Sequence, residues 1–243
     1  MSAYVLTSAQ LVLGSLDLSI DSAKFDIAGS VAMQDRTTFG TGGFVAKLPG
    51  LESWMFGVDG FADYASGAIS TTFDPTQIGS QQVLSIMPTN VAPSAGDPTI
   101  FTRGRLASLK QPTGNVGTIA GFSLSVESDT AGTPGVVLAP MASRGTSFTG
   151  SAVAYTGPKA GQSIYGALQV SAAAGTNLVV KIQSDDNSGF TSPTDRITFS
   201  TMSAVGWAWG TPVPGDLSTE TYWRATATAS SGTFSFHVLC GVT

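Results

Sequence analysis

The chain has 243 residues, of which only 11% are charged and 42% are hydrophobic, and its net charge is −5. Long surface helices need charged outer faces, so this composition favours many strands joined by turns of small residues. Residues 1–135 hold eleven acids and six bases, and residues 136–243 hold five of each. This charge distribution excludes a basic surface that binds nucleic acid tightly.

Alternating apolar and polar residues predict half-buried strands along the first part of the chain. The alternation covers residues 24–33, 52–59, 83–87, 99–109 and 119–127. One short helix is predicted over residues 74–82, because Asp74 can cap its first turn and Pro75 suits the first helical position.

A second set of alternating segments follows the turn-like stretch TAGTPG at residues 130–135. Turn clusters such as AAAGTN, SDDNSG and ASSG separate these segments, which is typical of an antiparallel sandwich. We therefore predict an all-β protein with two domains. Residues 1–138 form a β-sandwich with one short flanking helix, and residues 139–243 form a second antiparallel β-sandwich.

The residues that usually carry catalysis are scarce. His237 is the one histidine and Cys240 the one cysteine. Strand alternation puts Cys240 on the apolar side and His237 on the opposite side, toward solvent or a neighbouring molecule. A Cys–His dyad and a zinc ligand set are therefore not expected, and we predict no enzyme activity and no cofactor.

Two further groups of residues have alternative interpretations. The acidic segment SDDNSGF, with Asp185 and Asp186, fits either a calcium loop or a turn whose side chains cap the backbone, and the turn is favoured. Trp207, Trp209 and Trp223, with Tyr222, fit either a sugar-stacking platform or the core of the second sandwich, and the core is favoured.

The N-terminal segment has no basic region and only a short apolar run, so a signal peptide is not expected. No apolar run approaches the ~20 residues of a membrane span. These features predict a protein that folds in a cytoplasm and does not bind a membrane.

The stretch DRTTFGTGGFVAKLPGLESWMFGVDGFADY, residues 35–64, resembles the major tail tube proteins of long-tailed, siphovirus-like bacteriophages. The shared pattern is Asp35, Thr37, Thr38 and Phe39, a glycine-rich stretch, and the run from Pro49 to Leu51; Gly60 to Asp63 then ends the next strand. Residues 101–135 also resemble this family, and the likeness covers roughly residues 1–138. Residues 139–243 are similar to the β-domains that some members carry as an outer decoration.

This resemblance implies a structural subunit of the virion tail, assembled in the cytoplasm of the host bacterium. Members form rings, usually hexameric, that stack into a hollow tube for genome ejection. Inner-sheet strands of neighbouring subunits pair edge to edge, and a long loop reaches the next ring. The implied partners are further copies, the tape measure, tail terminator and distal tail proteins, and DNA that passes without tight binding.

Two sets of residues follow from the resemblance. The apolar, glycine-rich loop between two strands is predicted to stack rings through Thr38, Phe39, Gly42, Gly43, Phe44, Val45, Lys47, Leu48 and Pro49. Small hydroxyls and carboxylates on polar strand faces are predicted to line the lumen, namely Asp26, Ser30, Ser123, Ser125 and Glu127.

Other interpretations stay open. A lectin-like adhesin made of two sandwiches is the alternative function, and a tube subunit of a phage-derived particle such as a gene transfer agent is another. The ring order is six or three, although the absence of an internal repeat favours six.

Overall fold

A computed structural model of the protein describes residues 6–36, 45, 47–65, 68–73 and 75–243. Regular structure in these residues is almost entirely β-strand, which confirms the all-β prediction. The first half contains β1 (Gln10–Leu13), β2 (Leu16–Asp17), β3 (Ser22–Asp35), β4 (Lys47–Phe61), α1 (Ile69–Thr72), η2 (Pro75–Gln77), β5 (Gln81–Met87), β6 (Pro98–Thr113) and β7 (Gly121–Ser128). The second half contains β8 (Thr133–Arg144), β9 (Ser147–Thr149), β10 (Val153–Ala154), β11 (Ser163–Thr176), β12 (Val179–Asp185), β13 (Thr194–Thr198), β14 (Gly206–Trp209), β15 (Val213–Pro214), β16 (Tyr222–Thr228) and β17 (Ser231–Val242).

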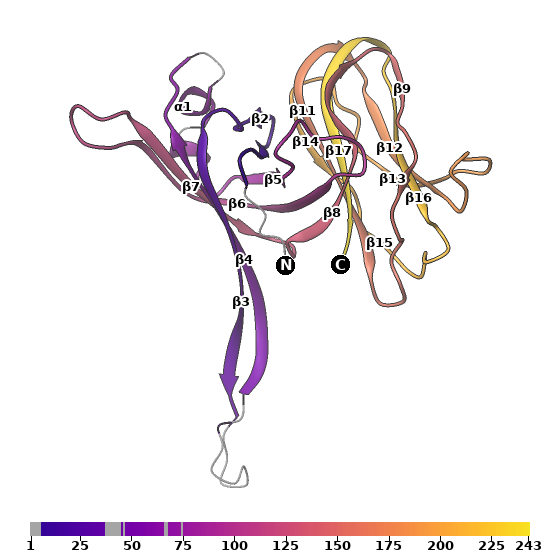
Figure 1. The fold of residues 1–243 in the computed structure, drawn as a ribbon, viewed down its shortest axis with the longest axis horizontal. Helices are drawn as coiled ribbons and strands as arrows, with labels where there is room; N and C mark the ends of the chain where they lie inside the picture. Colours follow the sequence, from indigo (N-terminus) through magenta and orange to yellow (C-terminus); the bar gives the residue numbers. More distant parts are fainter. Residues whose placement is uncertain (1–5, 37–44, 46, 66–67, 74) are drawn as a thin grey trace.

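The strands form two antiparallel sheets. The larger one has 12 strands and follows the order β14-β11-β17-β8-β6-β5-β1-β2, while β7, β4 and β3 branch from β6. The smaller one has 5 strands, with β10-β16-β12-β13 in order and β9 beside β16. Figure 1 shows the first half as a curled sheet with two protruding hairpins, β3–β4 and β6–β7, and the second half as a compact sandwich beside it.

The first half curls around its own core. Alternation in β4 turns Phe56 and Val58 inward and places Gly57 and Asp59 on the other face of the sheet. These side chains meet apolar residues of β1, β5 and β7, and Ile69 of α1 is fully buried in the same cluster. We call this cluster the first-half core.

The helix predicted over residues 74–82 is wrong. Residues 75–77 form the 3-10 turn η2, and β5 already begins at Gln81. Asp74, the predicted cap, lies outside the described residues. The short helix of this region is instead α1, a few residues earlier in the chain, where burial of Ile69 and Phe73 fixes a single turn. Tertiary packing outweighed the local capping signal here.

The second half is a β-sandwich. Strands β8, β17, β11 and β14 of the large sheet pack on β10, β16, β12 and β13 of the small one. The core between the layers includes Trp223, Phe234 and Phe236, all at most 1% exposed. Gly135 permits the close approach of β8 to β17, because a Cβ there would lie 2.1 Å from the carbonyl oxygen of Cys240.

The two halves share one sheet and a buried junction. Strand β8 pairs with β6 of the first half on one edge and with β17 of the second half on the other. A junction cluster of apolar residues is buried from both sides and consists of Val12, Val83, Met87, Phe101, Val137, Ala167 and Leu239. The predicted boundary at residue 138 therefore lies inside β8, and the division into two separate domains stays a prediction.

In the described part of the chain, no helix has the length and apolar character needed to cross a membrane.

Candidate assembly surface

Four strands of the first half form a sheet with one polar, accessible face. Cross-strand partners lie on the same face of a sheet, so the pairing of β3, β4, β7 and β6 shows which residues gather there. Lys24 stands in a row with Asp59, Ser123 and Lys110. The opposite face packs on the first-half core. We call the accessible side the polar face, which consists of Lys24, Asp26, Asp59, Arg105, Ser108, Lys110, Ser123, Ser125 and Glu127.

Four of the five predicted lumen residues are brought together on this face. Asp26 lies in one row with Gly57, Ser125 and Ser108, and Glu127 lies in the next row with Met55. Ser125 and Ser108 share a hydrogen bond with 2.8 Å between their oxygens. The fifth predicted residue, Ser30, lies further along β3 opposite Ser53, and both are exposed.

Basic side chains balance the acids on the polar face. Lys24, Arg105 and Lys110 stand beside Asp26, Asp59 and Glu127. Lys24 Nζ lies 3.9 Å from a carboxylate oxygen of Asp26 and 3.9 Å from one of Asp59. The sequence pattern pointed only to the carboxylates and hydroxyls, because the bases become neighbours of these acids only through strand pairing.

The four-stranded sheet has two edges without a strand partner. Strand β3 pairs with β4 alone along its length. At the other end, residues 107–113 of β6 pair with β7, whereas the pairing of β6 with β5 ends at Arg105 and the pairing with β8 ends at Phe101. Within the described residues, no further strand covers either edge, and such edges readily accept strands from another molecule.

The hairpin β3–β4 extends beyond the first-half core as a long arm (Figure 1). We define the arm as residues 29–35 and 47–53. Large apolar side chains on it are exposed, among them Val31, Met33, Leu48 and Leu51, with Leu51 86% exposed. The alternation in 24–33 predicted a half-buried strand, which holds for Phe25 and Ile27 but is wrong for Val31 and Met33, because no core lies beneath the arm.

The predicted ring-stacking loop is described only in part. Thr38, Phe39, Gly42, Gly43 and Phe44 lie outside the described residues. Val45 is 65% exposed. The remaining three begin β4, where Lys47 pairs with Asp35, Leu48 with Gln34 and Pro49 with Met33. The ion pair between Lys47 and Asp35 has its charged atoms 3.6 Å apart at the base of this loop.

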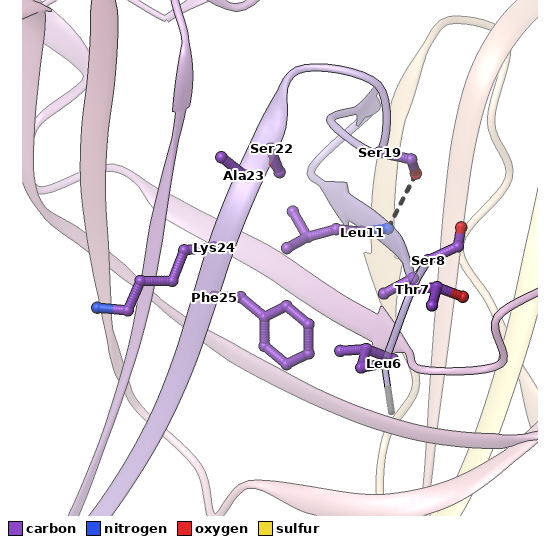
Figure 2. Close-up of a pocket in the computed structure, with 10 residues that line it drawn as sticks. Leu6, Thr7, Ser8, Leu11, Ser19, Ser22, Ala23, Lys24 and Phe25 are labelled. Atoms are coloured by element: carbon purple, nitrogen blue, oxygen red, sulfur yellow. Dashed lines mark hydrogen bonds between the residues drawn. The ribbon is translucent and has the colours of Figure 1, made fainter. Parts of the chain in front are cut away.

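An open hollow of about 540 Å³ lies between the N-terminal segment and the start of β3 (Figure 2). Leu6, Leu11 and Phe25 supply its apolar lining, and Lys24 stands at its rim. Ser19 closes one end, where its hydroxyl oxygen accepts the backbone N–H of Leu11 at 3.0 Å. The hollow thus lies directly beside the free edge of β3.

The prediction that His237 faces solvent or a neighbour is wrong, because it is fully buried. Its Nε2 lies 2.7 Å from Gln169 Oε1, and Ser85 of the first half donates its hydroxyl to the same oxygen at 2.6 Å. Strand β17 has apolar cores on both faces, since the first half covers the side that holds His237 and Leu239. Burial lowers the pKa of His237 to about 4.

Gln169 joins the halves through its amide group. Its Nε2 donates to the carbonyl oxygens of Val12, Gly14 and Val83 at 3.2, 2.9 and 2.9 Å. The sequence pattern gives no sign of this role, because a glutamine in an alternating strand is normally exposed. Cys240 is buried in the second-half core as predicted, and burial raises the pKa of its thiol.

The acidic segment adopts the turn that was favoured. Asp185 accepts the backbone N–H of Asn187 at 3.0 Å and that of Ser192 at 2.9 Å. Hydrogen bonds from the backbone, that of Ser192 first, hold the pKa of Asp185 below its usual range. Among the described residues, no group of three or more His, Cys, Asp or Glu side chains is arranged to hold a metal ion.

The tryptophans serve packing. Trp223 is fully buried in the second-half core, which confirms the favoured interpretation for this residue. Trp207 and Trp209 pack on the junction cluster, and the ring of Trp209 lies 5.6 Å from that of Phe101. These three rings are therefore not arranged as a flat exposed platform for a sugar.

No protein-family model matches the chain, and no curated protein matches it. Among solved structures, a chain from the virion of a native gene transfer agent particle is 17% identical, with a TM-score of 0.38, and the match covers 55% of this chain and 98% of that chain. The Dit protein of phage SPP1 is 11% identical, with a TM-score of 0.35 and coverage of 97% and 99%. A chain of the phage p2 baseplate is 9% identical, with a TM-score of 0.31 and coverage of 95% and 97%. TM-scores this low do not establish a shared fold, so the functional proposal depends on the geometry of this chain.

Proposed function

We propose that the chain is a structural subunit of a phage tail tube, in which rings of identical copies stack into a hollow conduit for genome delivery. The observation that carries this proposal is the sheet β3-β4-β7-β6, which has one buried face, one polar face and two unpaired edges. Such a subunit belongs to the virion and is assembled in the host bacterial cytoplasm, where it meets the tape measure, tail terminator and distal tail proteins.

An even number of alternating strands allows the sheet to continue around a ring. Strands β3, β4, β7 and β6 alternate in direction, so β6 runs opposite to β3. Rotation about a ring axis preserves strand direction along that axis. The free edge of β6 in one copy therefore meets the free edge of β3 in the next copy in antiparallel orientation, which closes a barrel without leaving edges.

The arm supplies contacts along the tube axis. It continues β3 and β4 beyond the ring body, and its exposed apolar side chains need a surface to cover them. A second copy in the adjacent ring provides this surface, and the predicted stacking residues Leu48 and Pro49 lie on the arm.

The polar face suits a wall along which DNA slides. Three acids and three bases lie on it, and Lys24 is close to Asp26 and Asp59, so few cations are free to neutralise phosphates. We propose that Asp26, Ser123, Ser125 and Glu127 face the lumen, with Ser30 toward the next ring. Rings of six copies and of three are both compatible with this arrangement, as is a phage-derived particle such as a gene transfer agent.

Negative-stain microscopy and sedimentation velocity of the purified chain test the proposal. We expect rings or hollow tubes of uniform width that grow with protein concentration. Monomers at all concentrations would overturn it, and monomers that bind immobilised glycans would favour the lectin-like adhesin instead.

A further inference from the structure

The free segment of β6 leads into a hairpin with an apolar tip. We define the hairpin tip as residues 114–120, between β6 and β7, which protrudes from the body in Figure 1. Val116 is fully exposed in it and Ile119 is 76% exposed. At the start of β3, beside the hollow, Ile20 is 95% exposed. Apolar groups therefore stand at one end of each free edge.

The two faces of the sheet restrict how these edges can pair. Lys110 of β6 and Lys24 and Asp26 of β3 belong to the polar face, and Ala28 of β3 lies on the same side of the sheet, in the row of Met55 and Glu127. A neighbouring copy must keep its polar face on the same side of the sheet, since a slip of one residue would turn polar groups into the apolar layer. Registers consequently differ by steps of two, and the three registers that keep residues 30–35 of the arm unpaired with Lys110 place it opposite Lys24, Asp26 or Ala28.

Charge selects among the three registers. Lys110 opposite Lys24 places like charges together, which destabilises a strand pair, whereas Lys110 opposite Asp26 pairs opposite charges. The register with Asp26 also sets residues 108–110, the regularly paired part of this edge, against residues 26–28 of the next copy, so that residues 30–35 of the arm stay free to reach the adjacent ring. In the same register the hairpin tip runs past the start of β3, toward Ile20 and the mouth of the hollow.

We propose that neighbouring copies pair in this one register, with Lys110 of one copy opposite Asp26 of the next and with Val116 and Ile119 covering Ile20 beside the hollow. This inference rests on the proposed tube function and names the contact that closes each ring. Closed barrels stagger their strands, and the side chains named here set the size of that stagger at the junction between copies.

Disulfide trapping tests the register directly. Ala28→Cys combined with Ser108→Cys places the two thiols in directly opposed positions of an antiparallel pair, where Cα atoms lie about 4.5–5.5 Å apart and a disulfide can form. Ser30→Cys combined with Ser108→Cys is the matched control, because it requires a register slipped by two residues and keeps both Lys110 and Asp26. The natural Cys240 is buried and does not compete.

We expect mild oxidation of assembled protein to give a ladder of covalent oligomers for the 28/108 pair and not for the 30/108 pair. Cross-linking of 30/108 alone would overturn the register, and cross-linking of neither pair in assembled tubes would overturn this edge pairing. A parent chain that never assembles would instead overturn the proposed function.

A charge swap gives an independent test. We expect Asp26→Lys and Lys110→Glu each to raise the critical concentration for assembly about tenfold or more, because every junction of a ring then carries like charges. The double variant should recover to within about twofold of the parent, since it restores the opposite-charge pair. Lys159→Glu, on an exposed loop of the second half, is the control that should leave assembly unchanged. Failure of the double variant to recover would contradict the proposed pair.

Discussion

The first and second halves of this chain differ in how much of their apolar surface is exposed. The second half closes a two-layer sandwich over its core, and of the large apolar side chains exposed in the described residues only Val205 belongs to it. The first half exposes all the others, among them Val31, Met33 and Leu51 of the arm, Val116 and Ile119 of the hairpin tip and Leu6 at the hollow. Monomeric proteins rarely expose so much apolar surface around free strand edges, so we propose that the contacts between copies are made by the first half.

The largest expected effect comes from cutting the two halves apart. If residues 1–138 formed a separate domain, as the sequence predicts, a chain ending at Leu138 would fold on its own. In the structure this cut divides β8 and uncovers Val12, Val83 and Phe101 of the junction cluster. We therefore expect the truncated chain to be insoluble or unfolded, as measured by soluble yield and circular dichroism. A folded, tube-forming truncation would show that the halves are separate domains after all.

Charging the arm separates assembly from folding. Leu48→Asp with Leu51→Asp should abolish tubes while single rings and the melting temperature stay unchanged, because both side chains are exposed and contact no core. Val205→Asp is the control from the second half and should leave tube formation intact. Electron microscopy measures tube formation by both variants. Normal tubes from the arm variant would show that the arm does not stack the rings.

Gln169→Leu tests the polar contact between the halves. It removes the donor for three buried carbonyl groups and the acceptor for Ser85 and His237. Unsatisfied buried groups cost about 1–3 kcal/mol each, and some of them have other partners, so we expect a loss of about 3–4 kcal/mol in the free energy of unfolding. Urea denaturation measures this loss. A change below about 1 kcal/mol in the free energy of unfolding would mean that the hydrogen bonds of Gln169 do not hold the two halves together.

The acid dependence of stability comes partly from His237. Burial is the main cause of its lowered pKa, Asp17 raises it and Arg144 lowers it further, and the result is about 4. The unfolded chain binds a proton near pH 6.5 and the folded chain only near pH 4, so stability is present above pH 6.5 and falls as the pH drops from 6.5 to 4. This contribution is at most about 3 kcal/mol. His237→Gln should flatten that part of the pH profile relative to the parent, and identical profiles would show that His237 does not titrate there.

Local pattern predicted the strands well, because alternation reports which side of a strand is buried. Phe25, Phe56 and Val126 all pack inward as their positions in the alternation indicate. Pattern could not show what lies on the far side of a strand. His237 alternates with Phe236 and Val238 and still meets a second core, and Val31 continues an apolar stripe past the end of any core. The predicted helix failed because its last residues belong to strand β5, which is fixed by long-range pairing with β6.

The sequence predicted which acids and hydroxyls belong to the candidate site, but it could not predict which residues become their neighbours. Asp26, Ser123, Ser125 and Glu127 were chosen by strand parity, and pairing brings them onto one face. Lys24, Arg105 and Lys110 share that face only because β3, β4, β7 and β6 lie in this order, and strand order is a property of the whole fold.

The central claim is that the sheet β3-β4-β7-β6 continues from copy to copy around a lumen. A cryo-electron microscopy reconstruction of the assembled chain tests it most directly. We predict a closed antiparallel barrel in which β6 of each copy pairs with β3 of the next, with Asp26 and Glu127 facing the bore and the second half outside the barrel. An assembly in which these edges stay unpaired, or in which both carboxylates face outward, would contradict the account.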